Sequence, residues 1–312
     1  IQEPPGRMVI IGAGPIGMEM AVAFRRLGAE ITVLDAAPQI LPLLLPEAAA
    51  VVERSVTAMG IELRAGTVAH RFDPATNTLT VGPLDEDPTD SIADVDKVLV
   101  AVGRVPNSDN LGLEDVGVEL DRGRIVVDGK GRTSADGVWA VGDVSTEGAT
   151  THAANAWGRR VIKHIVAPLA PTGDRPEHPA VTFTSPEAAS IGHQPADVPA
   201  DVRRITVDLS KADRSYTDGV DDGIKIVDVR RLSGKVLGAT IVGPRAGELI
   251  SIFSLGMKAG LPFHKWYGTV WPYPSYADAI GGVVDEYMKA AMKSIPSDAF
   301  AWLRGRVGRQ RS

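Results

Sequence analysis

The chain has 312 residues, enough for about two domains at a typical domain length of about 150 residues. Hydrophobic residues make up 44% and charged residues 23%, the balance of a folded globular protein rather than a disordered one. The net charge of −6 gives no electrostatic basis for binding nucleic acid. The absence of cysteine excludes disulfides, thiolate metal sites and cysteine nucleophiles within these residues.

The N-terminal part is apolar but does not have the pattern of a membrane segment. Residues 9–24 contain Glu19 and three glycines, and they are fewer than the ~20 apolar residues that span a bilayer. We therefore expect neither a transmembrane segment nor a signal peptide, and a cytoplasmic location. Because the sequence opens with Ile1 rather than Met, we expect a further segment upstream.

The first elements are predicted in the order strand, glycine turn, helix and strand. Residues 7–11 form a β-rich apolar run, residues 18–27 have helical spacing, and residues 31–34 predict the next strand with Asp35 at its end. A helix through about residue 59, a strand at 61–63, a polar hairpin and a strand at 98–102 follow. This first block closes near Gly103.

The glycine turn carries a motif with a physical explanation. In Gly12-x-Gly14-x-x-Gly17, the first glycine allows the tight turn, the second lets the backbone approach a pyrophosphate, and the third lets the helix pack on the strand. Asp35 can accept hydrogen bonds from the adenosine ribose hydroxyls, and no Lys or Arg lies between residues 31 and 41 to neutralise a 2′-phosphate. The pattern predicts NAD(H) rather than NADP(H); the alternative is a glycine-rich turn without a ligand.

The remaining chain divides into a glycine-rich part and an α+β part. Short alternating runs between residues 104 and 141 lead to Gly142-Asp143, and a helix is expected over residues 150–166. A proline-rich linker then precedes alternating strands and a helix over residues 246–259. The six histidines show no ligand spacing, so no metal site is predicted.

Four ordered motifs make the chain resemble the pyridine nucleotide-disulfide oxidoreductases, a family of FAD flavoproteins. The motifs are residues 8–35, 100–107, 133–144 and 183–192. The resemblance implies an α/β fold with a Rossmann-type NAD-binding domain at residues 1–103, a returning part of the FAD domain at 104–172, and an α+β dimerisation domain at 173–312. It also implies a homodimer, in agreement with the aromatic segment 266–276, which is apolar enough to need covering.

The resemblance also implies roles for particular residues. Asp143, with Gly142 and Gly103, belongs to the cofactor-binding motifs and would hold the ribityl and phosphate region of the flavin, and the backbone near Ala149 and Thr150 would approach its ring. Glu19 would lie near the nicotinamide carboxamide; without the resemblance, a buried partnered carboxylate and an exposed helix carboxylate are equally good interpretations. Pro15 stands where several relatives have an aromatic lid.

Two departures from the family pattern affect the expected activity. The N-terminal FAD half, with its redox-active cysteine pair, is absent from these 312 residues. Tyr273 and Asp278 stand where thiol-acting relatives have a histidine and a glutamate, and tyrosine, with a pKa near 10, is a poor proton shuttle at neutral pH. A packed interface aromatic is the alternative interpretation of Tyr273.

These observations predict an enzyme that passes hydride from NADH through FAD to a second, small-molecule electron acceptor, with Tyr273 and Asp278 as candidate catalytic residues. A dihydrolipoyl dehydrogenase-like or mercuric reductase-like disulfide reductase is one alternative. A non-catalytic NAD-binding dimer module is another. The identity of the electron acceptor does not follow from the sequence.

Overall fold

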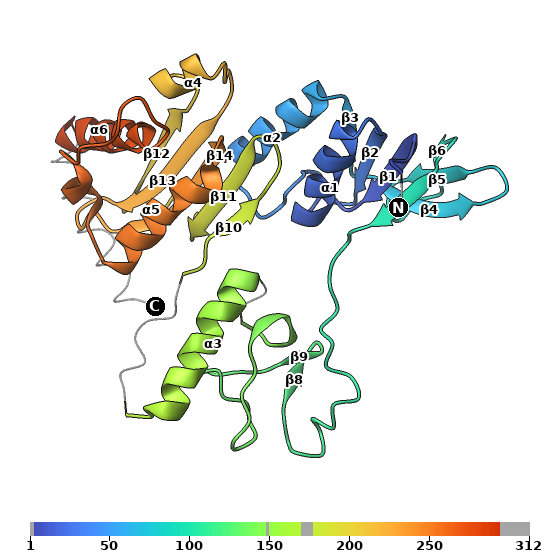
Figure 1. The fold of residues 1–312 in the computed structure, drawn as a ribbon, viewed down its shortest axis with the longest axis horizontal. Helices are drawn as coiled ribbons and strands as arrows, with labels where there is room; N and C mark the ends of the chain where they lie inside the picture. Colours follow the sequence, from blue (N-terminus) through green and yellow to red (C-terminus); the bar gives the residue numbers. More distant parts are fainter. Residues whose placement is uncertain (1–2, 148–149, 170–176, 294–312) are drawn as a thin grey trace. The chain divides into compact units, whose positions relative to one another are not determined.

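A computed structural model describes residues 3–147, 150–169 and 177–293 of the chain (Figure 1). The chain divides into two compact units. The first contains the residues up to Val102 and those from Pro179 onward, and the second contains Gly103–His178. Each unit is described by itself below.

The first unit begins with a four-stranded parallel sheet in the order β3-β2-β1-β7. The strands are β1 (Arg7–Ile11), β2 (Glu30–Asp35), β3 (Ile61–Ala65) and β7 (Lys97–Val100), and the helices α1 (Pro15–Arg26) and α2 (Pro46–Ala58) follow β1 and β2. The central residues of β1 and β2 are buried, as their apolar runs require in a parallel sheet. The α/β fold and the βαβ unit expected from the sequence are confirmed.

In the sequence, the strands of a small, separate antiparallel sheet lie between β3 and β7. Its strands are β4 (Val68–Asp73), β5 (Thr78–Gly82) and β6 (Asp90–Ile92). Leu79, Val81 and Ile92 share a core cluster with Val9 and Leu34 of the parallel sheet. The apolar face of this three-stranded sheet therefore covers part of the parallel sheet.

The C-terminal part of the first unit is a five-stranded antiparallel sheet in the order β10-β11-β14-β13-β12. The strands are β10 (Ala180–Thr182), β11 (Glu187–Gly192), β12 (Val202–Asp208), β13 (Ile224–Arg230) and β14 (Val236–Gly243). The helical segments are α4 (Asp213–Thr217), α5 (Ala246–Lys258), η2 (Phe263–Trp266) and α6 (Asp278–Lys293). Figure 1 shows α5 lying along this sheet, where it contacts β11 and β14, and α6 contacts β12.

One apolar core joins the two sheets of the first unit. Ile226 and Val242 from β13 and β14 are buried in the same cluster as residues of β1, α1 and α2. Arg54 of α2 forms an ion pair with Asp222 at 2.9 Å. The parallel sheet and the antiparallel sheet are therefore packed into one body.

The second unit has little regular structure apart from one helix. It contains β8 (Leu120–Asp121), β9 (Arg124–Ile125), η1 (Gly142–Val144) and α3 (Thr151–Val166). The strand-like run at residues 138–141 forms only an isolated bridge between Trp139 and Arg132. The described residues offer this run no neighbouring strand to pair with along its length, and backbone pairing is what a strand requires.

Candidate functional site

The three glycines of the motif that leads from β1 into α1 differ in what surrounds them. A Cβ atom on Gly12, which has a φ of 108°, would lie 2.5 Å from the Ala101 carbonyl oxygen. A Cβ atom on Gly17 would lie 1.8 Å from the Gly12 carbonyl oxygen. A Cβ atom on Gly14 would meet no protein atom within 4 Å. Packing inside the protein therefore explains the glycines at 12 and 17 but not the one at 14.

The open space at Gly14 lies at the N-terminus of α1. Gly14 is the N-cap residue, Pro15 occupies the first turn, and no side chain caps the helix. The first backbone N–H groups of a helix lack partners inside the helix, and the helix dipole favours negative charge at this end. This corner therefore has the shape and polarity for a phosphate group.

Asp35 lies at the carboxyl end of β2 and is tied to the glycine turn. Its Oδ2 accepts a hydrogen bond from the Ala13 N–H at 2.6 Å, and its Oδ1 accepts one from the Ala37 N–H at 2.7 Å. Each carboxylate oxygen has a second lone pair available for another donor. The side chain is half-buried and held in place next to Gly12 and Gly14.

Glu19 projects from the second turn of α1 toward the C-terminal part of the unit. Its Oε1 accepts a hydrogen bond from the Phe183 N–H at 2.9 Å. The side chain is half-buried, so the structure shows a partnered carboxylate rather than a freely exposed one. No local sequence pattern predicts this contact, because its two residues are 164 positions apart.

In the second unit, Asp143 lies in η1 and pairs with an arginine. Arg104 contacts the Asp143 carboxylate at 2.8 Å, and Arg124 donates a hydrogen bond to the Asp143 carbonyl at 2.9 Å. No local pattern predicts this ion pair, because its two residues are 39 positions apart. Gly103 and Gly142 both have positive φ angles, 148° and 80°.

Arg104, Arg124 and Asp143 border a hollow of about 600 Å³. Its lining consists of Arg104, Val105, Pro106, Asn107, Arg124, Val141, Asp143 and Val144. Thr150 lies at the N-cap of α3, where its hydroxyl accepts a hydrogen bond from the Ala153 N–H. Ala149 lies outside the described residues.

Tyr273 and Asp278 are not joined by a hydrogen bond among the described residues. The Tyr273 hydroxyl instead donates to the Asp213 carboxylate at 2.7 Å, and Asp278 is the first residue of α6. The hydrogen bond to Asp213 raises the pKa of Tyr273 above its ordinary value, and the negative charge of Asp278 adds to this effect. Asp213 carried no sequence signal, because nothing local connects it to residue 273.

A pocket of about 590 Å³ lies beside the start of α6 and contains a buried amine. Lys225 is 2% exposed, and its Nζ donates to the Ala279 carbonyl at 2.8 Å. Burial lowers the pKa of Lys225 to about 8, while the charges of Asp208 and Asp278 act in the opposite direction. Sequence reasoning did not single out this lysine, because its burial depends on the packing of β13 against α6.

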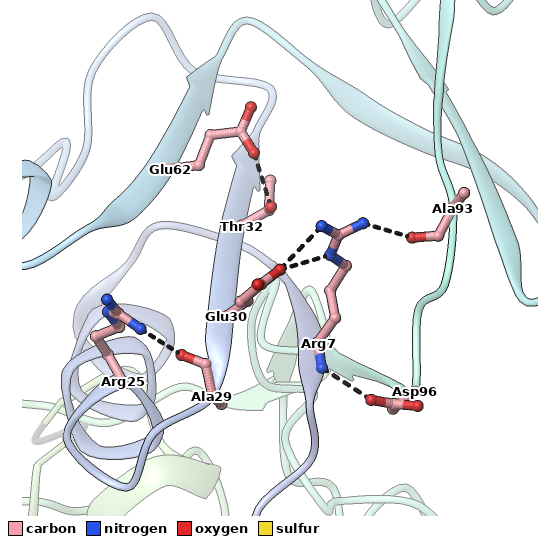
Figure 2. A network of polar contacts seen from close by, with 8 residues as sticks. All are labelled: Arg7, Arg25, Ala29, Glu30, Thr32, Glu62, Ala93 and Asp96. Carbon is pink, nitrogen blue, oxygen red and sulfur yellow. Dashed lines mark hydrogen bonds and ion pairs between the residues drawn. The ribbon is translucent and has the colours of Figure 1, made fainter.

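A network of charged and polar groups lies at the other end of the parallel sheet, where β1 and β2 begin (Figure 2). Arg7 donates to the Glu30 carboxylate and to the Ala93 carbonyl, and its backbone N–H donates to Asp96. The Glu62 carboxylate accepts from Thr32. Ligands of open α/β sheets bind at the carboxyl ends of the strands, whereas Arg7 and Glu30 begin β1 and β2. We therefore infer that this network has a structural role: it links β1 to β2 and to the segment between β6 and β7.

Within the described part of the chain, no group of three or more His, Cys, Asp or Glu side chains is arranged to hold a metal ion. No described helix is both long enough and apolar enough to cross a membrane.

Comparison with known proteins identifies the family. Residues 1–158 match the pyridine nucleotide-disulphide oxidoreductase family, and residues 178–283 match the dimerisation domain of the same family. The chain belongs to this family. The resemblance seen in the sequence motifs is therefore confirmed.

The relatives include dihydrolipoyl dehydrogenases. The protein of Halobacterium salinarum is 34% identical over 89% of this chain, and that of Haloferax volcanii is 32% identical over 93%. Among solved structures, LpdA from Mycobacterium tuberculosis matches with a TM-score of 0.83 at 27% identity, covering 92% of this chain and 62% of LpdA. The flavoprotein disulfide reductase RclA from Escherichia coli matches with a TM-score of 0.81 at 26% identity, covering 91% of this chain and 66% of RclA. The chain spans 59% and 62% of the lengths of the two dehydrogenases.

Proposed function

We propose that this chain is the NAD-binding and dimerisation part of an NADH-dependent FAD oxidoreductase. The observation that carries the proposal concerns Gly14, which lies at the N-terminus of α1, where no side chain caps the helix. No protein atom lies within 4 Å of the position that a Cβ atom would take at this residue. A dinucleotide pyrophosphate is the group that needs this space. In this proposal Asp35, which the Ala13 and Ala37 N–H groups hold beside the turn, accepts a hydrogen bond from a ribose hydroxyl with its remaining lone pairs.

The proposed roles of the other residues follow the same logic. Glu19 and the backbone at Phe183 form a polar contact that joins the α1 helix to the C-terminal part, where the nicotinamide end of the cofactor would be positioned. Asp143 borders a hollow of about 600 Å³, which fits a contribution to an FAD site. When bound, the flavin supplies the acceptance of hydride and its transfer to the second acceptor. The chain supplies binding and orientation.

The proposed organisation is an NAD-binding domain at residues 1–103, a returning part of the FAD domain at 104–172, and a dimerisation domain at 173–312. The proposed assembly is a homodimer, supported by the match of residues 178–283 to the family's dimerisation domain. The proposed acceptor is a small molecule.

Tyr273 distinguishes between two classes of acceptor. A disulfide acceptor takes up two electrons and two protons to become a dithiol, so it needs a group that exchanges protons near neutral pH, as imidazole does. The pKa of Tyr273 is raised by its hydrogen bond to Asp213, so the phenol releases its proton less readily here than in water, and less phenolate is present at neutral pH to act as a base. We therefore favour an acceptor other than an ordinary disulfide, with a dihydrolipoyl dehydrogenase-like activity as the second candidate because of the relatives' names.

The test is an absorbance spectrum of protein purified from the complete open reading frame, followed by anaerobic addition of NADH. We expect a flavin spectrum that bleaches on reduction. A long-wavelength charge-transfer band would indicate a thiolate beside the flavin and would favour the disulfide reductases. A colourless protein that still binds NADH would contradict the proposal and leave a nucleotide-binding module.

A further inference from the structure

Two tyrosines of the turn before α6 are hydrogen-bonded to the two ends of α4. The Tyr273 hydroxyl donates to Asp213 at 2.7 Å, and the Tyr276 hydroxyl donates to Asp218 at 3.0 Å. Asp213 is the first residue of α4, and Asp218 is its C-cap. The turn is therefore connected to a short helix about 60 residues earlier in the sequence by two matching tyrosine–aspartate contacts.

The two contacts lie in different surroundings. Tyr276 is 5% exposed, and its partner Asp218 also forms an ion pair with Arg214 at 2.8 Å. Tyr273 is 69% exposed. The contact at Tyr276 is thus part of the packing, whereas the contact at Tyr273 orients a side chain that faces outward.

Buried hydrogen bonds hold α4 in place. Ser215 is fully buried, and its hydroxyl donates to the Leu209 carbonyl at 2.7 Å. The Val220 N–H in turn donates to the Ser215 carbonyl at 2.8 Å. A carboxylate on such a support can hold a phenol in one orientation.

We infer that Asp213 is a positioning residue for Tyr273 and that the pair selects an electron acceptor carrying an N–H or O–H donor. The phenol has a single proton, and Asp213 engages it. What Tyr273 then offers to another molecule is an oxygen lone pair, which binds donors. The inference rests on the proposed function, in which the acceptor meets Tyr273.

The charges around the phenol act in the same direction. Within the described part of the chain, the ionisable groups that act on it are Asp213 and Asp278, and both are carboxylates that disfavour a phenolate. Tyr273 therefore keeps its proton at physiological pH and stays hydrogen-bonded to Asp213. Asp213→Asn removes the charge, whereas Asp213→Glu retains it.

The first measurement follows the phenol directly. In the full-length protein labelled with ¹³Cζ-tyrosine, the Tyr273 resonance is assigned by its loss in Tyr273→Phe and titrated with pH. We expect a pKa above the ordinary value of about 10 in the parent, a lower pKa in Asp213→Asn, and a restored one in Asp213→Glu. Asp218→Asn, which disturbs the other tyrosine, is the matched control and leaves the Tyr273 titration unchanged.

The second measurement follows acceptor recognition with a matched pair of probes. The flavoprotein is assayed with 2-amino-1,4-naphthoquinone, which has N–H donors, and 2-methyl-1,4-naphthoquinone, which has none. A single hydrogen bond predicts that the ratio of their KM values shifts by about fivefold against the amino compound in Tyr273→Phe and in Asp213→Asn. The KM for NADH serves as the internal reference, and Asp213→Glu restores the parental ratio.

The outcomes separate the two proposals. A Tyr273 pKa that does not respond to Asp213→Asn would overturn the inference, as would an unchanged ratio of KM values in that variant. A protein without flavin would overturn the proposed function, and the resonance of Tyr273 would still decide whether Asp213 orients it.

Discussion

At the scale of single residues, the glycine turn separates what folding requires from what a ligand requires. Gly17 has a protein atom where its side chain would be, whereas Gly14 has open space. Replacement of each by alanine should therefore affect different properties. The two variants form a matched pair, because each adds the same methyl group to the same glycine motif at the start of α1.

We predict that Gly14→Ala folds normally and loses NADH affinity. The added methyl group meets no protein atom, and alanine at an N-cap costs about 1 kcal/mol or less relative to glycine. The same methyl group occupies the space proposed for the pyrophosphate, so we expect the Kd to rise about tenfold or more, equivalent to about 1.4 kcal/mol. Isothermal titration with NADH and thermal unfolding measure the two effects.

Gly17→Ala should instead lower the unfolding temperature, because its methyl group would collide with the Gly12 carbonyl. If Gly14→Ala bound NADH as tightly as the parent does, the proposed role of this corner would be wrong.

A second residue-scale prediction concerns Asp35→Asn. The carboxylate accepts from two backbone N–H groups, and an asparagine amide has only one acceptor oxygen for them. We expect weaker NADH binding and a smaller preference for NADH over NADPH, because the charge that repels a 2′-phosphate is gone. The ratio of kcat/KM values for the two cofactors measures this preference. An unchanged ratio would show that Asp35 only braces the turn.

At the scale of elements, the contact between β13 and α6 buries a lysine at a cost that depends on pH. The pKa of Lys225 is about 8 in the folded protein, against an ordinary value of 10.5. Below pH 8 both the folded and the unfolded chain hold the proton, and the cost of burying the charge is fully present. Between about pH 8 and pH 10.5 only the unfolded chain retains it, so the folded state gains stability as the pH rises.

We predict that the stability of the parent relative to Lys225→Met increases over this interval, by about 3 kcal/mol at most. Taking the difference between the two proteins cancels the groups that titrate in both. The measurement is the midpoint of thermal unfolding at several pH values. Lys258→Met, at an exposed position on α5, is the control and should show no such trend. A flat difference for Lys225→Met would mean that the amine is already solvated.

The element scale also shows which features could be predicted from the sequence. The βαβ unit was predictable because strand, glycine turn, helix and acid are consecutive in the chain, and each has a local signal. The partners of Glu19 and Tyr273 were not, because Phe183 and Asp213 reach them only through the packing of distant elements. The run at residues 138–141 has strand composition, but a strand also needs a neighbour, which composition does not specify.

At the scale of the whole molecule, the segment between η2 and α6 exposes an apolar surface. Tyr267 is 61% exposed and Val270 is 93% exposed. A contiguous exposed apolar patch usually marks a protein interface. The segment lies inside the part of the chain that matches the family's dimerisation domain. These two observations together suggest that a second copy of the chain covers it.

We predict that the full-length protein sediments as a dimer at micromolar concentration and that Val270→Asp shifts it toward monomer. A carboxylate at this position would lose its hydration on assembly without gaining a partner of opposite charge, which weakens association. Leu84→Asp is the control, because Leu84 is 63% exposed but lies outside the dimerisation domain. Sedimentation velocity over a range of concentrations measures both. A parent protein that stays monomeric would contradict the predicted dimer. A Val270→Asp variant that stays as dimeric as Leu84→Asp would show that the interface lies elsewhere.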